Sequence, residues 1–440
     1  MNLTSTTIRA AREALATGRA TPAAFAEQAL RNANRNSGKN TYLWRDPAWT
    51  MQEAARAAEV PRGSSGALGD GLGNLRGIPV SVKDCFDLAG APTTAGVSFY
   101  RDLNGNAAQD SWLVEQIRKA GAVITGKTHL HPLAYGITGE NPDFGDCEQP
   151  GNPGALTGGS SSGAAASILE GSALAAIGTD TGGSVRAPAA LCGLTGYRAS
   201  VGRGDWRGAA HLAPSFDTMG WLFRDLEDAP LLAEVFAPGK SAEVRQFKRF
   251  AVVHDAFLAD CEPAIAQSLS ATVDELHALG LESAIVDVSW WADSFEIYAP
   301  IQAWESARIH AGHFEKTPPA IRERLEWGSK INEAEMAAFR ARHAQFRSRL
   351  DDLLHQHELL LLPASPVARL NIGFDNTQAR KRILRYTTPF SLGGVPVITI
   401  PCAVGGMQLA AAREEDESLL HLAARLGSAR GAAASVEPRT

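Results

Sequence analysis

The chain begins with a helical pattern of apolar positions. From residue 6 to about 34, apolar side chains such as Ile8 and Leu15 recur among Ala, Arg and Glu. The pattern breaks near residue 18, and Thr21 followed by Pro22 suits the N-cap and first position of a new helix. The sequence therefore predicts two amphipathic helices within an N-terminal helical segment at 6–60.

Short β-rich runs alternate with helical patterns in the next segment, 75–240. Residues 78–82 (IPVSV) predict a strand, 112–120 a helix, and 122–125 a second strand. Alternation of this kind is typical of an α/β layered fold, so we expect the catalytic core here.

A long helical stretch divides the second half of the chain. A strand predicted at 249–254 and an amphipathic helix at 263–279 precede it. Residues 290–356 then carry a helical pattern throughout. Because this stretch interrupts a strand-bearing core, we interpret it as a lid or insertion over a pocket.

The chain then returns to the core in the segment 358–426, where 359–362 and 395–401 predict buried strands. The Ala-rich tail at 427–440 lacks an apolar period, and we expect it to be frayed. The run 62–74 (RGSSGALGDGLGN) predicts a flexible loop. We expect all of 1–440 to form one domain.

Composition excludes several classes of partner. With 45% hydrophobic and 20% charged residues, the chain can bury a sizeable core. The 42 basic and 48 acidic residues give a net charge of −6, and no long run has one sign. We therefore expect neither nucleic acid nor anionic membrane as a partner.

The five cysteines are scattered, with no spacing typical of a zinc site or a disulfide framework. We interpret them as free thiols. Charged residues such as Arg9 and Arg12 interrupt the N-terminus where a signal peptide needs an apolar run, and no run of apolar residues is long enough to span a membrane. These observations predict a cytoplasmic protein.

Three features carry candidate chemistry: Lys83 at the end of a strand-like run, the loop GGSSSG at 158–163, and the turn GTDTGGSVR at 178–186. The loop is followed at once by a helix predicted at 164–170, which leaves backbone N–H groups unpaired. Successive glycines in the turn let neighbouring N–H groups converge, as acyl-transfer chemistry needs where an oxyanion develops. The lysine that follows the glycines of a phosphate-binding loop is absent here.

These segments resemble the amidase signature family. The motifs are GIPVSVKDCFDLAG (77–90), TGGSSSGAAAS (157–167) and GTDTGGSVRAPAALCGLTGYR (178–198), with flanking matches at 110–128, 215–225 and 387–401. Ser160 follows Lys83 by 77 residues and Ser184 follows Ser160 by 24, as in that family. The resemblance covers about 6–426 and implies a single α/β/α domain with a central mixed β-sheet flanked by helices.

The resemblance also implies roles for a catalytic triad. Ser184 would be the nucleophile, Ser160 a bridging serine after a cis peptide bond from Gly159, and Lys83 the general base. A neutral lysine can act as that base if burial brings its pKa near 7. No metal or organic cofactor is then needed.

The turn around Ser184 would supply the remaining groups. The resemblance implies an oxyanion hole made of backbone N–H groups from Thr181, Gly182, Gly183 and Ser184. Asp180 and Arg186 flank this turn, and we interpret them as a buried ion pair that fixes its shape.

Two other readings of single residues stay open. A thiol nucleophile at Cys85 would leave both serines unexplained, and the pair His129 and His131 has no evident carboxylate or cysteine partner for a metal. The chain departs from the family at Thr157, where a proline is usual, and at 131–132, where an acidic residue is usual.

The runs AYGITGENPDFG (134–145) and DTMGWLFR (217–224) look most like short amidases related to indole-3-acetamide hydrolases. They imply a small-molecule amide substrate. One alternative is a hydrolase of urea-like or carbamoyl compounds, where the cluster Lys381, Arg382, Arg385 would hold a carboxylate. Another is the amidase component of a glutamine-dependent tRNA amidotransferase, against which the acidic balance counts. The sequence leaves open whether the protein is a homodimer.

Overall fold

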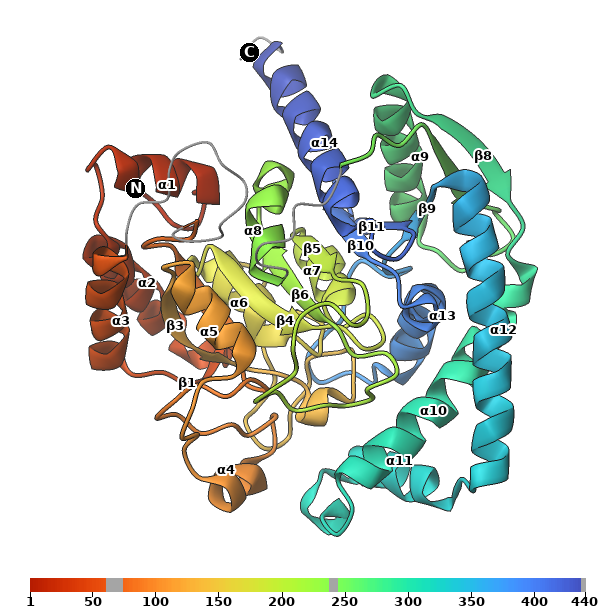
Figure 1. Ribbon diagram of the computed structural model, residues 1–440, viewed down its shortest axis with the longest axis horizontal. Coiled ribbons are helices and arrows are strands. Elements are labelled where there is room, and N and C mark those ends of the chain that lie inside the picture. Colours follow the sequence, from red (N-terminus) through yellow and green to blue (C-terminus); the bar gives the residue numbers. More distant parts are fainter. Residues whose placement is uncertain (61–73, 237–243, 437–440) are drawn as a thin grey trace.

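A mixed sheet of 11 strands runs through the centre of the computed structural model, which describes residues 1–60, 74–236 and 244–436 (Figure 1). The strand order is β1-β3-β2-β4-β6-β5-β10-β11-β9-β7-β8. The strands are β1 (Tyr42–Trp44), β2 (Pro79–Lys83), β3 (Val123–Thr128), β4 (Ala175–Thr179), β5 (Thr195–Arg198), β6 (Met219–Phe223), β7 (Arg249–Val253), β8 (Glu282–Val286), β9 (Leu359–Pro363), β10 (Val397–Pro401) and β11 (Gly406–Ala411).

The sheet joins two blocks of strands. In the first block β2 pairs parallel with both β3 and β4, and in the second β7 pairs parallel with β8 and β9. Antiparallel pairing of β5 with β10 connects the blocks, with Gly196 opposite Thr399. The predicted fold class, α/β with a central mixed sheet, is confirmed.

Helices cover both faces of the sheet. They are α1 (Ile8–Ala16), α2 (Pro22–Arg35), α3 (Pro47–Glu59), α4 (Ser98–Asn104), α5 (Trp112–Lys119), α6 (Ser162–Glu170), α7 (Arg186–Cys192), α8 (Ala229–Phe236), α9 (Pro263–Ala278), α10 (Ser294–Ile309), α11 (Pro319–Lys330), α12 (Glu333–His357), α13 (Thr377–Gly393) and α14 (Asp416–Val436). Strand β9 is therefore buried on both faces. On one face, Leu359 and Leu361 pack in the core cluster that includes α9 and α14. On the other, Leu360 and Leu362 pack in the cluster that includes α10, α12 and α13. A strand covered on both faces reads as a continuous apolar run.

The N-terminal helices form as the sequence predicts. The Thr21 side chain accepts a hydrogen bond from Ala24 N, and Pro22 occupies the first turn of α2. The glycine-rich run predicted as a loop at 62–74 lies outside the described residues, apart from Asn74. Within the described ranges, every helix is too short or too polar to cross a membrane.

The expectation of a frayed tail at 427–440 is wrong for the part that is described. Helix α14 continues through this segment to Val436, while 437–440 lie outside the described residues. Alanine has the highest helix propensity, so a helix needs no apolar period there. The Arg430 guanidinium also binds the Glu275 carboxylate of α9 at 2.7 Å, which ties this part of α14 to the core.

The predicted helical stretch at 290–356 contains α10, α11 and α12, which lie together on one side of the molecule (Figure 1). Helix α10 packs against α11, α12 and α13. It also carries Tyr298 to the turn that contains Gly182. The stretch is therefore in contact with the segment that holds the candidate chemistry.

Candidate active site

Lys83 ends β2 with its side chain fully buried. Its Nζ donates to Ser160 Oγ at 2.8 Å and to Thr179 Oγ1 at 2.7 Å. Burial lowers the pKa of the Lys83 amine to about 8, although the nearby Cys85, Asp180 and Asp217 act in the opposite direction. A minor fraction of Lys83 is therefore neutral near pH 7 and able to accept a proton.

Ser160 stands in the loop that leads into α6. The peptide bond between Gly159 and Ser160 is cis, as the family resemblance implies. The neighbouring Ser161 N donates to Ser184 O at 3.2 Å. This backbone bond brings the loop of Ser160 beside the turn of Ser184.

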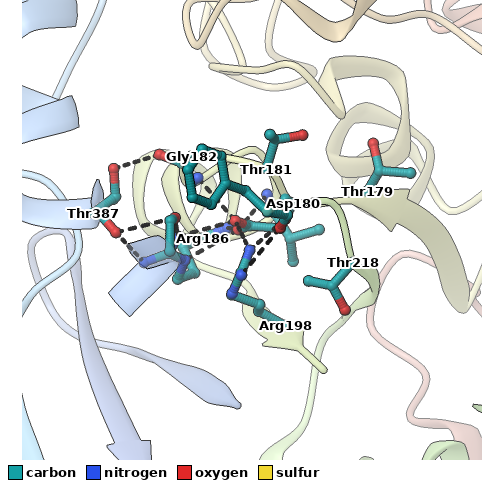
Figure 2. A network of polar contacts seen from close by, with 12 residues as sticks. Thr179, Asp180, Thr181, Gly182, Arg186, Arg198, Thr218 and Thr387 are labelled. Atoms are coloured by element: carbon teal, nitrogen blue, oxygen red, sulfur yellow. Dashed lines mark hydrogen bonds and ion pairs between the residues drawn. The ribbon is translucent and has the colours of Figure 1, made fainter. Parts of the chain in front are cut away.

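The turn from 178 to 186 is built around the Asp180 carboxylate (Figure 2). Arg186 and Arg198 both contact Asp180 Oδ1, at 2.9 and 2.8 Å, and all three side chains are fully buried. Burial alone would raise the pKa of Asp180, but the two guanidinium groups hold it well below its usual range. Asp180 is therefore ionised, and its charge is compensated inside the protein.

The same carboxylate binds backbone N–H groups of the turn. Gly183 N donates to Asp180 Oδ1 at 2.8 Å and Val185 N donates to Oδ2 at 3.1 Å. The N–H of Gly183 is therefore engaged, contrary to its expected place in an oxyanion hole. Among the described residues, no acceptor is found for the N–H groups of Thr181, Gly182 and Ser184.

Two glycines of the turn are required by close packing. A Cβ on Gly182 would lie 2.4 Å from Tyr298 Oη of α10. Gly183 has φ +121°, and a Cβ there would lie 2.7 Å from Thr387 Oγ1 of α13. Thr387 Oγ1 also donates to Gly182 O at 2.5 Å (Figure 2). Helices α10 and α13 thus hold the turn from two sides.

Ser184 lines a pocket with a cavity volume of about 20 Å³. The wall is made of the loop 134–137, Gly182 and Ser184 of the turn, Tyr298 and Gln302 of α10, and Arg380 and Leu384 of α13. Ligand pockets for drug-sized molecules are usually larger, about 300–1,000 Å³. The pocket beside Ser184 is therefore narrow in this structure.

The surroundings of Cys85 and His129 bear on the two alternative readings, a thiol nucleophile and a metal site. Burial raises the pKa of the Cys85 thiol to about 11, so Cys85 is protonated and poorly nucleophilic. His129 is hydrogen-bonded at both ring nitrogens, Nδ1 with Ser162 Oγ at 2.7 Å and Nε2 with Gly145 O at 2.9 Å. In the part of the chain that the structure describes, no three His, Cys, Asp or Glu side chains are grouped as for a metal ion.

The segment 131–132 lies under the pocket loop. His131 Nε2 would lie 2.1 Å from a Cβ on Gly136, so this loop packs directly on the imidazole ring. Burial lowers the pKa of His131 well below its usual value, and the cations Arg324 and Arg380 lower it further. His131 is therefore neutral and adds no charge to the pocket.

The predicted carboxylate-binding cluster does not line the pocket. Arg382 and Arg385 contact the Asp260 carboxylate, at 3.4 and 2.7 Å, and Lys381 is exposed. Arg380, one residue earlier on α13, lines the pocket instead. Successive residues of a helix point in different directions, so Arg380 lines the pocket while Arg382 and Arg385 contact Asp260.

Sequence reasoning also missed residues that contact the predicted ones. Thr179 stands inside the matched motif, and Arg198 is its last residue, so both were within reach of a motif argument. Tyr298 and Arg380 lie in helical stretches outside the matched motifs. Only the tertiary fold brings them to Ser184.

Comparison with known proteins decides the family, because a family model described as Amidase matches residues 27–420. The chain belongs to the amidase family. This amidase is 32% identical to the 2-amino-5-chloromuconic acid deaminase of Comamonas testosteroni, over 80% of the chain and 81% of the relative. It is 28% identical to a glutamyl-tRNA(Gln) amidotransferase subunit from Chloroflexus aurantiacus, over 94% of the chain and 95% of the relative.

A solved structure described as an amidase matches this amidase with a TM-score of 0.85 and 31% identity. The match covers 97% of this chain and 100% of the solved one. Sequence and fold therefore agree that the chain is an enzyme of the amidohydrolase type, acting on amide C–N bonds.

Proposed function

We propose that this amidase hydrolyses a small-molecule amide to a carboxylate and ammonia through an acyl-enzyme on Ser184. The observation that carries the proposal is the 2.8 Å hydrogen bond from Lys83 Nζ to Ser160 Oγ, beside the pocket that Ser184 lines. A serine hydroxyl needs a base within reach, and the buried Lys83 amine supplies one.

Acylation would begin with two linked proton transfers. Ser184 gives its proton to Ser160 as Ser160 passes its own proton to the neutral Lys83 amine. The Ser184 Oγ then forms a bond to the amide carbon, and the carbonyl electron pair moves to oxygen. The N–H groups of Thr181, Gly182 and Ser184, which have no acceptor among the described residues, would stabilise this oxyanion.

Collapse of the tetrahedral intermediate would break the C–N bond. The protonated Lys83 returns its proton through Ser160 to the leaving nitrogen, which departs as ammonia. Water then attacks the Ser184 ester in the same way, and its proton follows the same route to Lys83. The carboxylate leaves, and Ser184 recovers its proton.

We propose supporting roles for the groups around this centre. The ion pair of Asp180 with Arg186 stabilises the turn, because Asp180 also accepts backbone hydrogen bonds from Gly183 and Val185. The stretch 290–356 serves as a lid, since its helix α10 contributes Tyr298 and Gln302 to the pocket wall.

The choice of substrate rests on pocket size and on the relatives. One relative is named as a deaminase of 2-amino-5-chloromuconic acid, and the other as a subunit of a glutamyl-tRNA(Gln) amidotransferase. We favour a small molecule as the partner, because the net charge of −6 gives no attraction to tRNA. We also propose that the enzyme acts in the cytoplasm.

A panel of amides, ureas and carbamoyl compounds, with ammonia release as the readout, tests this function. A neutral fluorophosphonate followed by mass spectrometry of the digested protein reports the reactive serine directly. We expect labelling at Ser184. Labelling at Ser160 instead, or glutamine turnover that depends on tRNA, would contradict the proposal.

A further inference from the structure

Arg380 brings an uncompensated positive charge to the pocket of Ser184. It lies near the start of α13 and lines the pocket wall. Its Nε is buried without a hydrogen-bond acceptor, and among the described residues its guanidinium forms no ion pair and donates no hydrogen bond. Arg380 is half-buried, and a charged group withdrawn from water in this way usually has a partner, which this guanidinium lacks within the described residues.

The other arginines of α13 show how the fold compensates such charges elsewhere. Arg382 and Arg385 bind the Asp260 carboxylate on the side of the helix away from the pocket. At the start of α13, Glu140 accepts hydrogen bonds from Asn376 at 3.1 Å and from Thr138 at 2.7 Å. The Glu140 carboxylate therefore binds other partners and does not contact Arg380.

A second arginine adds to the charge of this region. Burial, and after it the repulsion from Arg324, lowers the pKa of Arg380 to about 10, so Arg380 is still protonated at neutral pH. The Arg324 guanidinium is engaged, because it donates to Tyr135 O and lies 5.3 Å from the Tyr135 ring centre. Arg380 is thus the cation of this pair that is free to bind a ligand.

We propose that the substrate amide carries a carboxylate and that Arg380 binds this carboxylate while the amide carbonyl lies at Ser184. The inference rests on the proposed function, since it takes Ser184 as the reacting residue. A guanidinium matches a carboxylate through two parallel hydrogen bonds. Ile137 and Leu384 offer apolar wall for the connecting carbons. The substrate class is the small amido acid, such as the monoamide of a short dicarboxylic acid.

Matched substrates test this inference. Succinamate and glutaramate are compared with pentanamide and hexanamide, which have similar chain lengths without the charge. We expect kcat/KM to be at least about 10-fold higher for the acids, the size of a charge-assisted hydrogen bond. In Arg380→Gln this ratio should fall by about 10- to 100-fold, mainly through KM. Arg380→Lys should restore part of it.

Lys381→Gln is the matched control, because it removes one positive charge from the same helix at an exposed position. We expect it to keep the wild-type ratio. Equal or better turnover of the neutral amides by the wild type would overturn the inference. A ratio that falls as far in Lys381→Gln as in Arg380→Gln would overturn it too.

A labelling experiment separates this inference from the function on which it rests. Succinate or glutarate should slow the labelling of Ser184 by a neutral fluorophosphonate, and the protection should require at least about 10-fold more acid in Arg380→Gln. Labelling at Ser184 that neither acid slows would overturn the carboxylate site and leave the proposed function standing. A wild type that is never labelled at Ser184 would overturn both.

Discussion

Lys83 is a lysine without an exposed atom, and its surroundings define the pH at which the triad can work. Its pKa, lowered by burial to about 8, implies that the base is mostly protonated below pH 8 and mostly neutral above it. We therefore expect kcat/KM and the rate of fluorophosphonate labelling to rise with pH through about 8. A labelling rate that does not change across this range would contradict Lys83 as the base.

The same shift affects stability. The folded-state pKa lies below the unfolded value of 10.5, so the folded protein binds fewer protons between about pH 8 and 10.5. The contribution of Lys83 to the free energy of unfolding should therefore rise with pH across this window. Urea unfolding of Lys83→Met should lack this component when compared with the wild type.

Substitution of each of the three triad side chains should affect the reaction in a different way. Ser184→Ala should abolish the acyl-enzyme, while Ser160→Ala keeps the nucleophile and should lower the rate by about 10²–10⁴. Lys83→Ala should be at least as damaging, and the double variant with Ser160→Ala should resemble the worse single one. Single-turnover kinetics with mass spectrometry of the acyl-enzyme measure these effects. Undiminished labelling of Ser184→Ala would overturn the assignment.

Chelation should leave the activity unchanged, because the proposed base, nucleophile and oxyanion donors are all side chains or backbone groups of this chain. His129 already uses both ring nitrogens within the protein. Ammonia release after exhaustive treatment with a chelator is the measurement. Loss of activity that zinc restores would show that the His129 and His131 pair had been wrongly dismissed.

Among the elements, the turn at 178–186 depends on how closely α10 approaches it. Gly182→Ala would place a methyl group 2.4 Å from Tyr298 Oη, so the turn or the buried tyrosine must move. Displacement of the Gly182 N–H should cost about 10²–10³ in kcat, as for the loss of one oxyanion donor. Gly38→Ala is the control, since a Cβ there meets nothing within 4 Å. Unchanged kcat in Gly182→Ala would contradict this donor.

The elements that carry the motifs could be predicted, because neighbouring residues in the sequence are enough to indicate them. Glycine spacing indicated the turn, and the strand-like run ending at Lys83 indicated β2. Strands β1, β4, β5, β6, β8 and β11 were missed. Among them, β5 is TGYR, with a glycine inside and an arginine at its end, and β8, ESAIV, is largely exposed. The contribution of Arg380 depends on the rotation of α13 against the pocket, which no local pattern encodes.

At the scale of the whole molecule, we propose that the 11 strands unfold as one unit. Ile177 lies in β4 and Leu361 in β9, in different blocks of the sheet, and both are fully buried. Ile177→Ala and Leu361→Ala should each lower the free energy of unfolding by about 2–5 kcal/mol. Both should shift the same calorimetric transition. Two transitions, each sensitive to only one variant, would show that the blocks are separate domains.

The contact between β5 and β10 also has a consequence for the newly made chain. The first block contains β1 to β6, and its strands can pair before synthesis reaches β10. Strand β10 lies about 200 residues after β5, its neighbour in the sheet. At about 5–20 residues per second, the ribosome needs roughly 10–40 s for this stretch. During that time β5 is an open edge, able to pair with another nascent chain. Chaperone binding to ribosome-bound intermediates should therefore peak before residue 397 emerges, and premature termination in this interval should yield aggregates.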